Sequence, residues 1–67
     1  MNLVEIGALV QNQREQLGLT QIQLARISGL SHATVKQLEG GTLKEVGVTK
    51  LLVLFDLLGL DLSLIHI

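Results

Sequence analysis

The sequence predicts an all-α domain of four to five helices, followed by a short C-terminal β-strand. Proline is absent from all 67 residues, so no position is barred from a helix interior. Apolar residues recur three and four positions apart over most of residues 1–59, whereas apolar and polar residues alternate after residue 59. We therefore expect one helical domain over residues 1–59 and a distinct tail over residues 60–67.

The first helix is expected over residues 3–17. Asn2 and Glu5 have the spacing of an N-terminal capping box. Arg14 falls within the apolar stripe of this helix, where a buried charge would need a partner. Gly7 costs about 1 kcal/mol relative to alanine in mid-helix, which favours a close approach to another part of the chain. The stripe consists of Leu3, Ile6, Val10 and Leu17.

Residues 20–40, TQIQLARISGLSHATVKQLEG, predict two short helices joined by a tight turn. Thr20 and Gln23 have the spacing of a second capping box, and Ser31 can cap the helix that follows. Gly29 lies between the two helices and can take the left-handed conformation that a sharp reversal needs. Proteins use this unit to place a helix in the DNA major groove. The expected helices span 21–28 and 32–39.

The outer face of the helix at 32–39 indicates what this unit binds. At about 100° per residue, Val35 and Leu38 point to one side. The opposite side carries hydrogen-bonding groups, one cation and a small apolar group, which can meet base edges and phosphates. A merely solvated surface is the alternative, and the two capped helices around one turn favour nucleic acid over it. The residues of this outer face are His32, Ala33, Lys36 and Gln37.

The last helix is expected over residues 48–58, after a polar loop in which Lys44 is placed to reach a phosphate. This helix is apolar almost all round, and such a helix needs cover on every side. In a chain this short, the second side needs another molecule. One face consists of Val48, Leu51, Leu52, Phe55 and Leu58, and the second of Val53, Leu54 and Leu57.

Period-two alternation through Leu60, Leu62 and Leu64 predicts a strand that has no partner strand in its own chain. A twofold axis would cover the second apolar face of the last helix and would also give the strand a partner. The helix face would meet its own copy, and the two strands would pair with each other. We therefore expect a homodimer. Residues 62–67, LSLIHI, are also the in-frame translation of a widely used sequencing adapter, and on that alternative the natural C-terminus lies elsewhere.

The formal net charge of −1 is not the basic balance that is usual for a DNA-binding protein. Its distribution is more favourable: residues 20–44 carry a net charge of +2, and the rest of the chain carries −3. We expect modest affinity from each monomer and a requirement for two copies.

The composition also excludes several classes. Cysteine is absent, and His32 and His66 lie far apart, so no metal site or other cofactor is expected. The chain lacks a nucleophile–base–acid set and a phosphate-cradling glycine loop, which argues against an enzyme. It also lacks a leader sequence and an apolar run of about twenty residues, so we expect no membrane partner and a cytoplasmic, nucleoid-associated location.

The segment GLTQIQLARISGLSHATVKQLEGG resembles the helix-turn-helix of phage-repressor-like (Xre-type) regulators. In that family GLTQ-x-x-LA, a turn glycine, a serine cap and a QLE-G ending recur. LFDLLGLDLSL is similar to the end of HipB-like antitoxins and autorepressors. The resemblance covers most of the chain and implies a lambda-repressor-like domain that binds double-stranded DNA at a pseudo-palindromic operator. For an antitoxin, it also implies a HipA-like kinase toxin as partner.

The resemblance assigns roles to individual residues. Gln37 can pair with adenine, and Ala33 can touch a thymine methyl group. His32 departs from the glutamine that is common in phage repressors, so its preferred base is left open. Arg14 and Glu39 are expected to form a semi-buried ion pair. Base contacts are expected from His32, Ala33, Lys36 and Gln37; backbone contacts from Gln21, Ser31, Thr34, Lys36, Lys44 and Arg14; dimer contacts from Val53, Leu54, Leu57, Leu60, Leu62 and Leu64.

Two functions therefore remain. The first is a sequence-specific DNA-binding regulator, a dimeric autorepressor that can also serve as an antitoxin. The second is a helical protein-interaction module without DNA binding.

Overall fold

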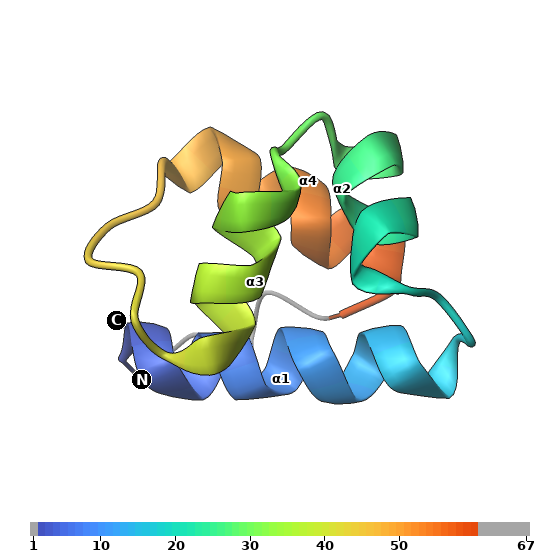
Figure 1. Ribbon diagram of the computed structural model, residues 1–67, viewed down its shortest axis with the longest axis horizontal. Helices are drawn as coiled ribbons and strands as arrows, with labels where there is room; N and C mark the ends of the chain where they lie inside the picture. Colours follow the sequence, from blue (N-terminus) through green and yellow to red (C-terminus); the bar gives the residue numbers. More distant parts are fainter. Residues whose placement is uncertain (1, 61–67) are drawn as a thin grey trace.

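The computed structural model describes residues 2–60, which form four helices. They are α1 (Leu3–Gln16), α2 (Gln21–Ser28), α3 (His32–Gly40) and α4 (Val48–Leu58). α1 lies along one edge of the molecule and packs against α3 and α4. α2 packs against α3 and α4, and α4 lies behind α3 in the view of Figure 1. The four-helix, all-α fold is confirmed. The predicted strand falls outside the described residues, apart from its first position, and no strand occurs within residues 2–60.

The helix ends around the turn follow from local hydrogen bonds. The Thr20 hydroxyl accepts from the Gln23 N–H at 3.0 Å, and the Gln23 side chain accepts from the Thr20 N–H at 2.8 Å. Ser31 Oγ accepts from the Thr34 N–H at 3.0 Å and so caps α3. Gly29 ends α2 with a φ of 76°, a left-handed conformation that glycine adopts without steric cost.

The close approach that Gly7 indicates is made to α3. A Cβ atom on Gly7 would lie 1.9 Å from the Leu38 carbonyl oxygen and 2.9 Å from its carbon. The two helices therefore cross with backbone against backbone, and only glycine fits there. Farther along α1, the assignment of Leu17 to the inner stripe is wrong: Leu17 caps the helix and is 50% exposed.

The core is built from all four helices and the turn before α3. On α4 the inner stripe has the spacing i, i+3, i+4, i+7, so the predicted face is partly wrong. Val48 and Leu52 are exposed, whereas Leu54 is fully buried. Leu54 therefore cannot serve as a dimer contact, because its own core already covers it. The inner stripe of α4 consists of Leu51, Leu54, Phe55 and Leu58.

The end of α4 is tied to α1. Gln13 Nε2 donates to the Leu58 carbonyl oxygen at 2.8 Å, across 45 positions of sequence. The Leu60 N–H donates to the Phe55 carbonyl at 2.8 Å, and the Leu60 side chain packs partly buried on the core of its own chain. Among residues 2–60, no helix is long and apolar enough to span a membrane.

Candidate nucleic-acid interface

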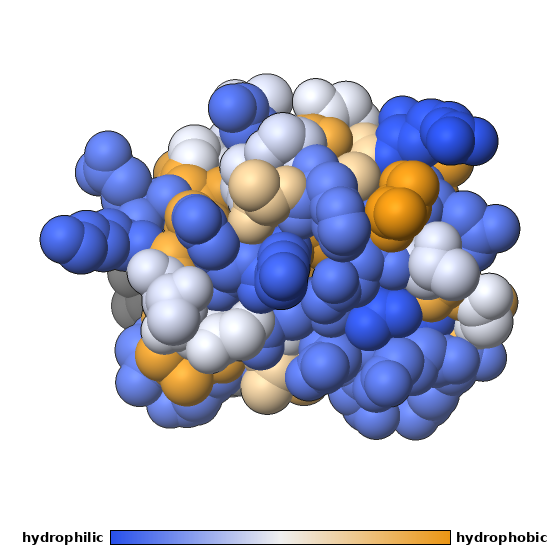
Figure 2. All heavy atoms as spheres, viewed as in Figure 1, coloured by the Kyte–Doolittle hydropathy of each residue, from blue (hydrophilic) through white to orange (hydrophobic). Residues whose placement is uncertain are grey.

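The outer side of α3 is an exposed surface on a rigid support. Val35 and Leu38 anchor the helix in the core, with 0% and 1% of their surface exposed. The four residues that were expected to read bases are all exposed on the other side: His32, Ala33, Lys36 and Gln37. The face of the molecule on which α3 lies in front of α4 is mostly hydrophilic (Figure 2).

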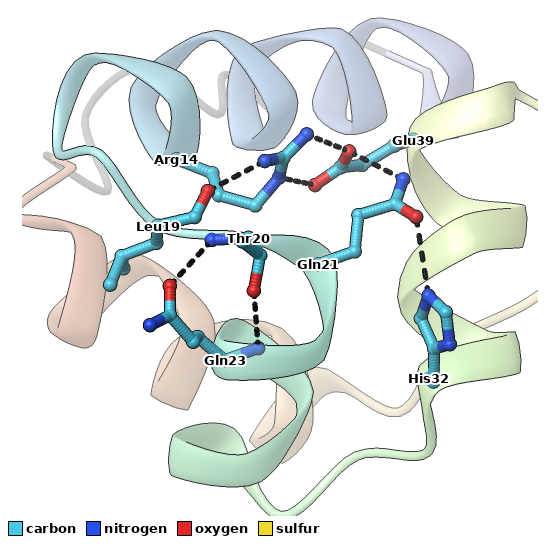
Figure 3. A network of polar contacts seen from close by, with 7 residues as sticks. All are labelled: Arg14, Leu19, Thr20, Gln21, Gln23, His32 and Glu39. Carbon is cyan, nitrogen blue, oxygen red and sulfur yellow. Dashed lines mark hydrogen bonds and ion pairs between the residues drawn. The ribbon is translucent and has the colours of Figure 1, made fainter.

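A buried ion pair holds α3 against α1. Arg14 Nε donates to Glu39 Oε2 at 2.7 Å, and Arg14 Nη2 donates to Glu39 Oε1 at 2.9 Å (Figure 3). This two-point geometry is the strong, directional form of an arginine–carboxylate contact. The hydrogen bonds to Glu39 raise the pKa of Arg14. The two residues are only 8% and 9% exposed, so the pair is a structural element of the core edge.

The same arginine also fixes the start of α2, because Arg14 Nη1 donates to the Leu19 carbonyl oxygen at 2.7 Å. All three nitrogens of the guanidinium therefore have partners within the fold. The phosphate contact expected for Arg14 does not fit this placement, since the group is buried and engaged on the inside.

Gln21 extends the ion pair to the surface. Its Nε2 donates to Glu39 Oε1 at 3.0 Å, and its Oε1 lies 3.4 Å from His32 Nε2 (Figure 3). Gln21 is the first residue of α2, and His32 is the first residue of α3. The two helices are thus joined side chain to side chain at the edge of the exposed surface.

Gln21 and Glu39 line a shallow open groove that we call the α3 groove, whereas Arg14 and His32 do not line it. It unites residues from α1, the start of α2, the outer side of α3 and the following loop. Gln21, Ala33, Lys36 and Gln37 were predicted as site residues, whereas Gln11 and Thr42 were not. The lining residues are Gln11, Gln21, Ala33, Lys36, Gln37, Glu39, Gly40 and Thr42.

A family model described as helix-turn-helix matches residues 10–65 of the chain. The chain belongs to the helix-turn-helix family. It is therefore of the DNA-binding, transcription-regulating kind, in a family of regulatory domains that are not typically enzymes. Among curated proteins, none matches the sequence significantly.

The charge of the helix-turn-helix surface suits a polyanion. Among the residues that line the α3 groove, Lys36 is the one cation and Glu39 the one carboxylate. Arg14 offsets the charge of Glu39, so Lys36 determines the sign of the groove. Lys44, also expected to meet the backbone, is exposed on the loop that follows α3.

Two hydroxyl groups lie at the N-terminal end of α3. Ser31 Oγ and Thr34 Oγ1 are 2.8 Å apart and form a hydrogen bond, while Ser31 Oγ also caps the helix. Ser31 is exposed, whereas Thr34 is half-buried and lines a second hollow that Lys50 shares. The structure therefore separates Thr34 from the α3 groove and places it on the flank of the helix-turn-helix.

The loop after the helix-turn-helix is held by one carbonyl group. The Gln37 carbonyl oxygen accepts from the N–H groups of Thr42 and Leu43, at 3.0 and 3.3 Å. Thr42 and Gln37 both line the α3 groove. Sequence reasoning missed Thr42 because polar loop residues are common, but Gln11 carried a signal: it lies three residues before Arg14, on the same side of α1.

The described part of the chain contains no group of three or more His, Cys, Asp or Glu side chains that could hold a metal ion.

Proposed function

We propose that this protein is a sequence-specific repressor that binds a pseudo-palindromic operator as a homodimer, with α3 in the major groove. One observation carries the proposal: the exposed face of α3 is polar and cationic, and a buried ion pair and a glycine crossing fix that helix against α1. A helix that reads bases has to be held rigidly, because the positions of its side chains determine the specificity.

The base contacts would come from the exposed residues of α3. Gln37 has a free side chain whose amide can pair bidentately with adenine, and Ala33 can touch a thymine methyl group. Lys36 lines the same α3 groove and suits guanine or a phosphate. His32 stands at the front of the helix, where recognition helices of this kind meet base edges.

The backbone contacts would surround this row. Gln21 and Ser31 lie at the first turns of α2 and α3, where free N–H groups favour phosphate. Lys44 on the loop and Lys36 would each release counterions on binding. Thr34 would contact the DNA backbone from the side of α3 that faces Lys50. To this set the α3 groove adds Gln11 and Thr42 as candidate phosphate contacts.

The homodimer would form through the outer face of α4. Val53 and Leu57 are each 40% exposed, and Leu52, which was expected to lie inside, is 42% exposed. Val53 and Leu57 lie one turn apart and form an exposed apolar patch, whereas Leu52 lies on the other side of Asp56 around the helix. The tail, with Leu60, Leu62 and Leu64 as its alternating residues, would add a strand pair across the same axis. Two recognition helices about 34 Å apart would match one turn of DNA.

The resemblance to HipB-like proteins favours a particular regulatory role. On that basis the protein would be a cytoplasmic dimer that represses transcription of its own operon. An antitoxin of that type would also bind a HipA-like kinase toxin. A kinase-like reading frame beside the gene would support the antitoxin, and an unrelated neighbour would support a plain repressor.

The exposed apolar patch on α4 also favours a second candidate, a helical protein-interaction module without DNA binding. Binding-site selection from random DNA, followed by gel-shift titration at low and moderate salt, separates the two. The repressor should yield one pseudo-palindromic motif, and its affinity should fall steeply with salt. Selection without any motif, and equal affinity for all fragments, would contradict it.

A further inference from the structure

One side chain ties α4, the helix of the proposed dimer surface, to the rest of the fold. Gln13 Nε2 on α1 donates to the Leu58 carbonyl oxygen at 2.8 Å, and Gln13 is half-buried where the end of α4 meets α1 (Figure 1). Within residues 2–60, no other hydrogen bond joins α4 to another helix. The inner stripe of α4 packs through apolar side chains, and apolar contacts have no preferred direction. The Gln13 bond is therefore the directional contact of α4.

The end of α4 needs this donor. The last carbonyl groups of an α-helix have no partner within the helix. In α4, two of them accept from the N–H groups of Gly59 and Leu60. The Leu58 carbonyl is left for a partner from elsewhere, and Leu58 is only 1% exposed, so solvent can contribute little. A carbonyl oxygen only accepts, so the Gln13 side chain has to present its amino group to it.

Gln13 directly precedes the residue that holds α3. Arg14 donates to Glu39 on α3 and to the Leu19 carbonyl oxygen before α2. Successive residues of an α-helix point about 100° apart, so Gln13 and Arg14 reach different helices from adjacent positions on α1. A single turn of α1 therefore fixes both the recognition helix and the helix that carries the proposed dimer surface.

We infer that Gln13 is a positioning residue that fixes the angle between α3 and α4, and thereby the half-site spacing that the dimer accepts. The inference rests on the proposed function, because Val53 and Leu57 on α4 would form the twofold contact. A tilt of α4 by about 10° displaces a point half a molecular length away, about 15 Å, by about 3 Å, which is close to the rise of one base pair. In a twofold dimer, the tilt acts on both copies.

The role of Gln13 concerns geometry and not the DNA-binding surface. Gln13 does not line the α3 groove, and its hydrogen bond goes to α4. Loss of the donor should therefore leave the affinity for a single half-site unchanged and widen the range of spacings that the dimer accepts. A residue that only stabilises the fold would instead lower the affinity by the same factor at every spacing.

The first test measures the separation of the two recognition helices without DNA. The chain contains no cysteine, so Ala33→Cys introduces a single exposed site on α3 for a nitroxide spin label. Double electron–electron resonance on the dimer should give one narrow distance distribution centred at about 34 Å. Adding Gln13→Met, which keeps the length of the side chain but removes the donor, should broaden or shift this distribution. Gln13→Lys, which keeps a donor, should restore it.

The second test measures the spacing preference, by competition binding on selected operators whose half-sites are moved one base pair closer or farther apart. A hydrogen bond of this kind is typically worth a factor of about 2 to 10, so Gln13→Met should reduce the wild-type preference for its own spacing by about that factor. Its affinity for an isolated half-site should not change. Gln16→Met, at an exposed glutamine on α1, is the matched control and should behave as the wild type. If Gln13→Met does not fold, Gln13→Asn, whose amide is one methylene shorter, replaces it.

The outcomes separate the inference from the proposed function. A Gln13→Met dimer with the distance distribution and the spacing preference of the wild type would overturn the inference while the repressor function stands. An equal loss of affinity at every spacing would also overturn it, because that result indicates a structural role alone. If the wild type gives no distance between two labels, or selects no motif, the proposed function fails and the inference fails with it.

Discussion

Replacing Gly7 by alanine sets a local gain against a loss in tertiary packing. In mid-helix, alanine is favoured over glycine by about 1 kcal/mol. The new Cβ would lie 1.9 Å from the Leu38 carbonyl oxygen, where ordinary contact begins at 3.4 Å, so α1 and α3 would have to separate by about 1.5 Å. Because the opposing atoms belong to the backbone of α3, no side-chain rotation can relieve the contact.

That separation would reach the rest of the interface between the two helices. Val10 and Leu38 are fully buried there, and the hydrogen bonds between Arg14 and Glu39 are 2.7 and 2.9 Å long. Overpacking of this kind typically costs about 1–3 kcal/mol and can cost more. We expect a net destabilisation of about 2 kcal/mol or more after the helix gain. A domain of this size has about 3–10 kcal/mol in total.

Urea denaturation followed by circular dichroism measures the effect. Gly40→Ala is the matched control, because Gly40 also lies in a helix, has no positive φ, and has nothing within 4 Å of an added Cβ. The control should be neutral or stabilising by up to about 1 kcal/mol. A Gly7→Ala midpoint at or above that of the wild type would refute the reasoning, because the two helices would then not need a glycine to cross.

Three further predictions concern the ion pair and the dimer. Glu39→Gln leaves the buried Arg14 without a countercharge and should destabilise the fold by about 3–5 kcal/mol; a denaturation midpoint near wild type would argue for two independent charges. Hydrogen bonds to Glu39 raise the pKa of Arg14 in the folded protein. The ion pair therefore stabilises the fold fully at any pH below the ordinary arginine pKa, and this stabilisation is lost only in strongly alkaline solution, when Arg14 loses its proton. The contribution of this pair to the denaturation midpoint of the wild type should therefore stay constant between pH 7 and pH 11. In Arg14→Lys it should decrease toward pH 11, because the ordinary pKa of lysine is about 10.4. Leu57→Glu should turn a dimer into a monomer in sedimentation equilibrium, and a chain ending at Asp61 should do the same if the tail contributes; dimers in both cases would contradict the proposed interface.

Features that depend on neighbouring residues were predictable from the sequence. The caps at Thr20 and Ser31 and the turn at Gly29 use hydrogen bonds and backbone angles within a few positions. Such local features can be predicted from the sequence because both partners of each hydrogen bond lie in the same short segment. The helix-turn-helix unit could therefore be predicted before any tertiary contact was known.

Features that depend on packing were harder to predict. A helix that is apolar all round offers several possible inner stripes, so α4 could be assigned the wrong face, with Leu52 inside and Leu54 outside. Gly7 signalled an approach without naming its partner. The link from Gln21 to Glu39 joins positions 18 residues apart through side chains alone, and no periodicity encodes it.

The measurement that tests the recognition surface most directly is the affinity of Gln37→Ala for the selected operator and for its single-base variants. We expect a loss of about 1–3 kcal/mol on the operator and relaxed preference at one base position. Lys36→Ala should instead weaken binding to all sequences alike and lower the salt dependence by about one counterion. If Gln37→Ala binds the operator with unchanged affinity and unchanged preference, α3 does not read the DNA.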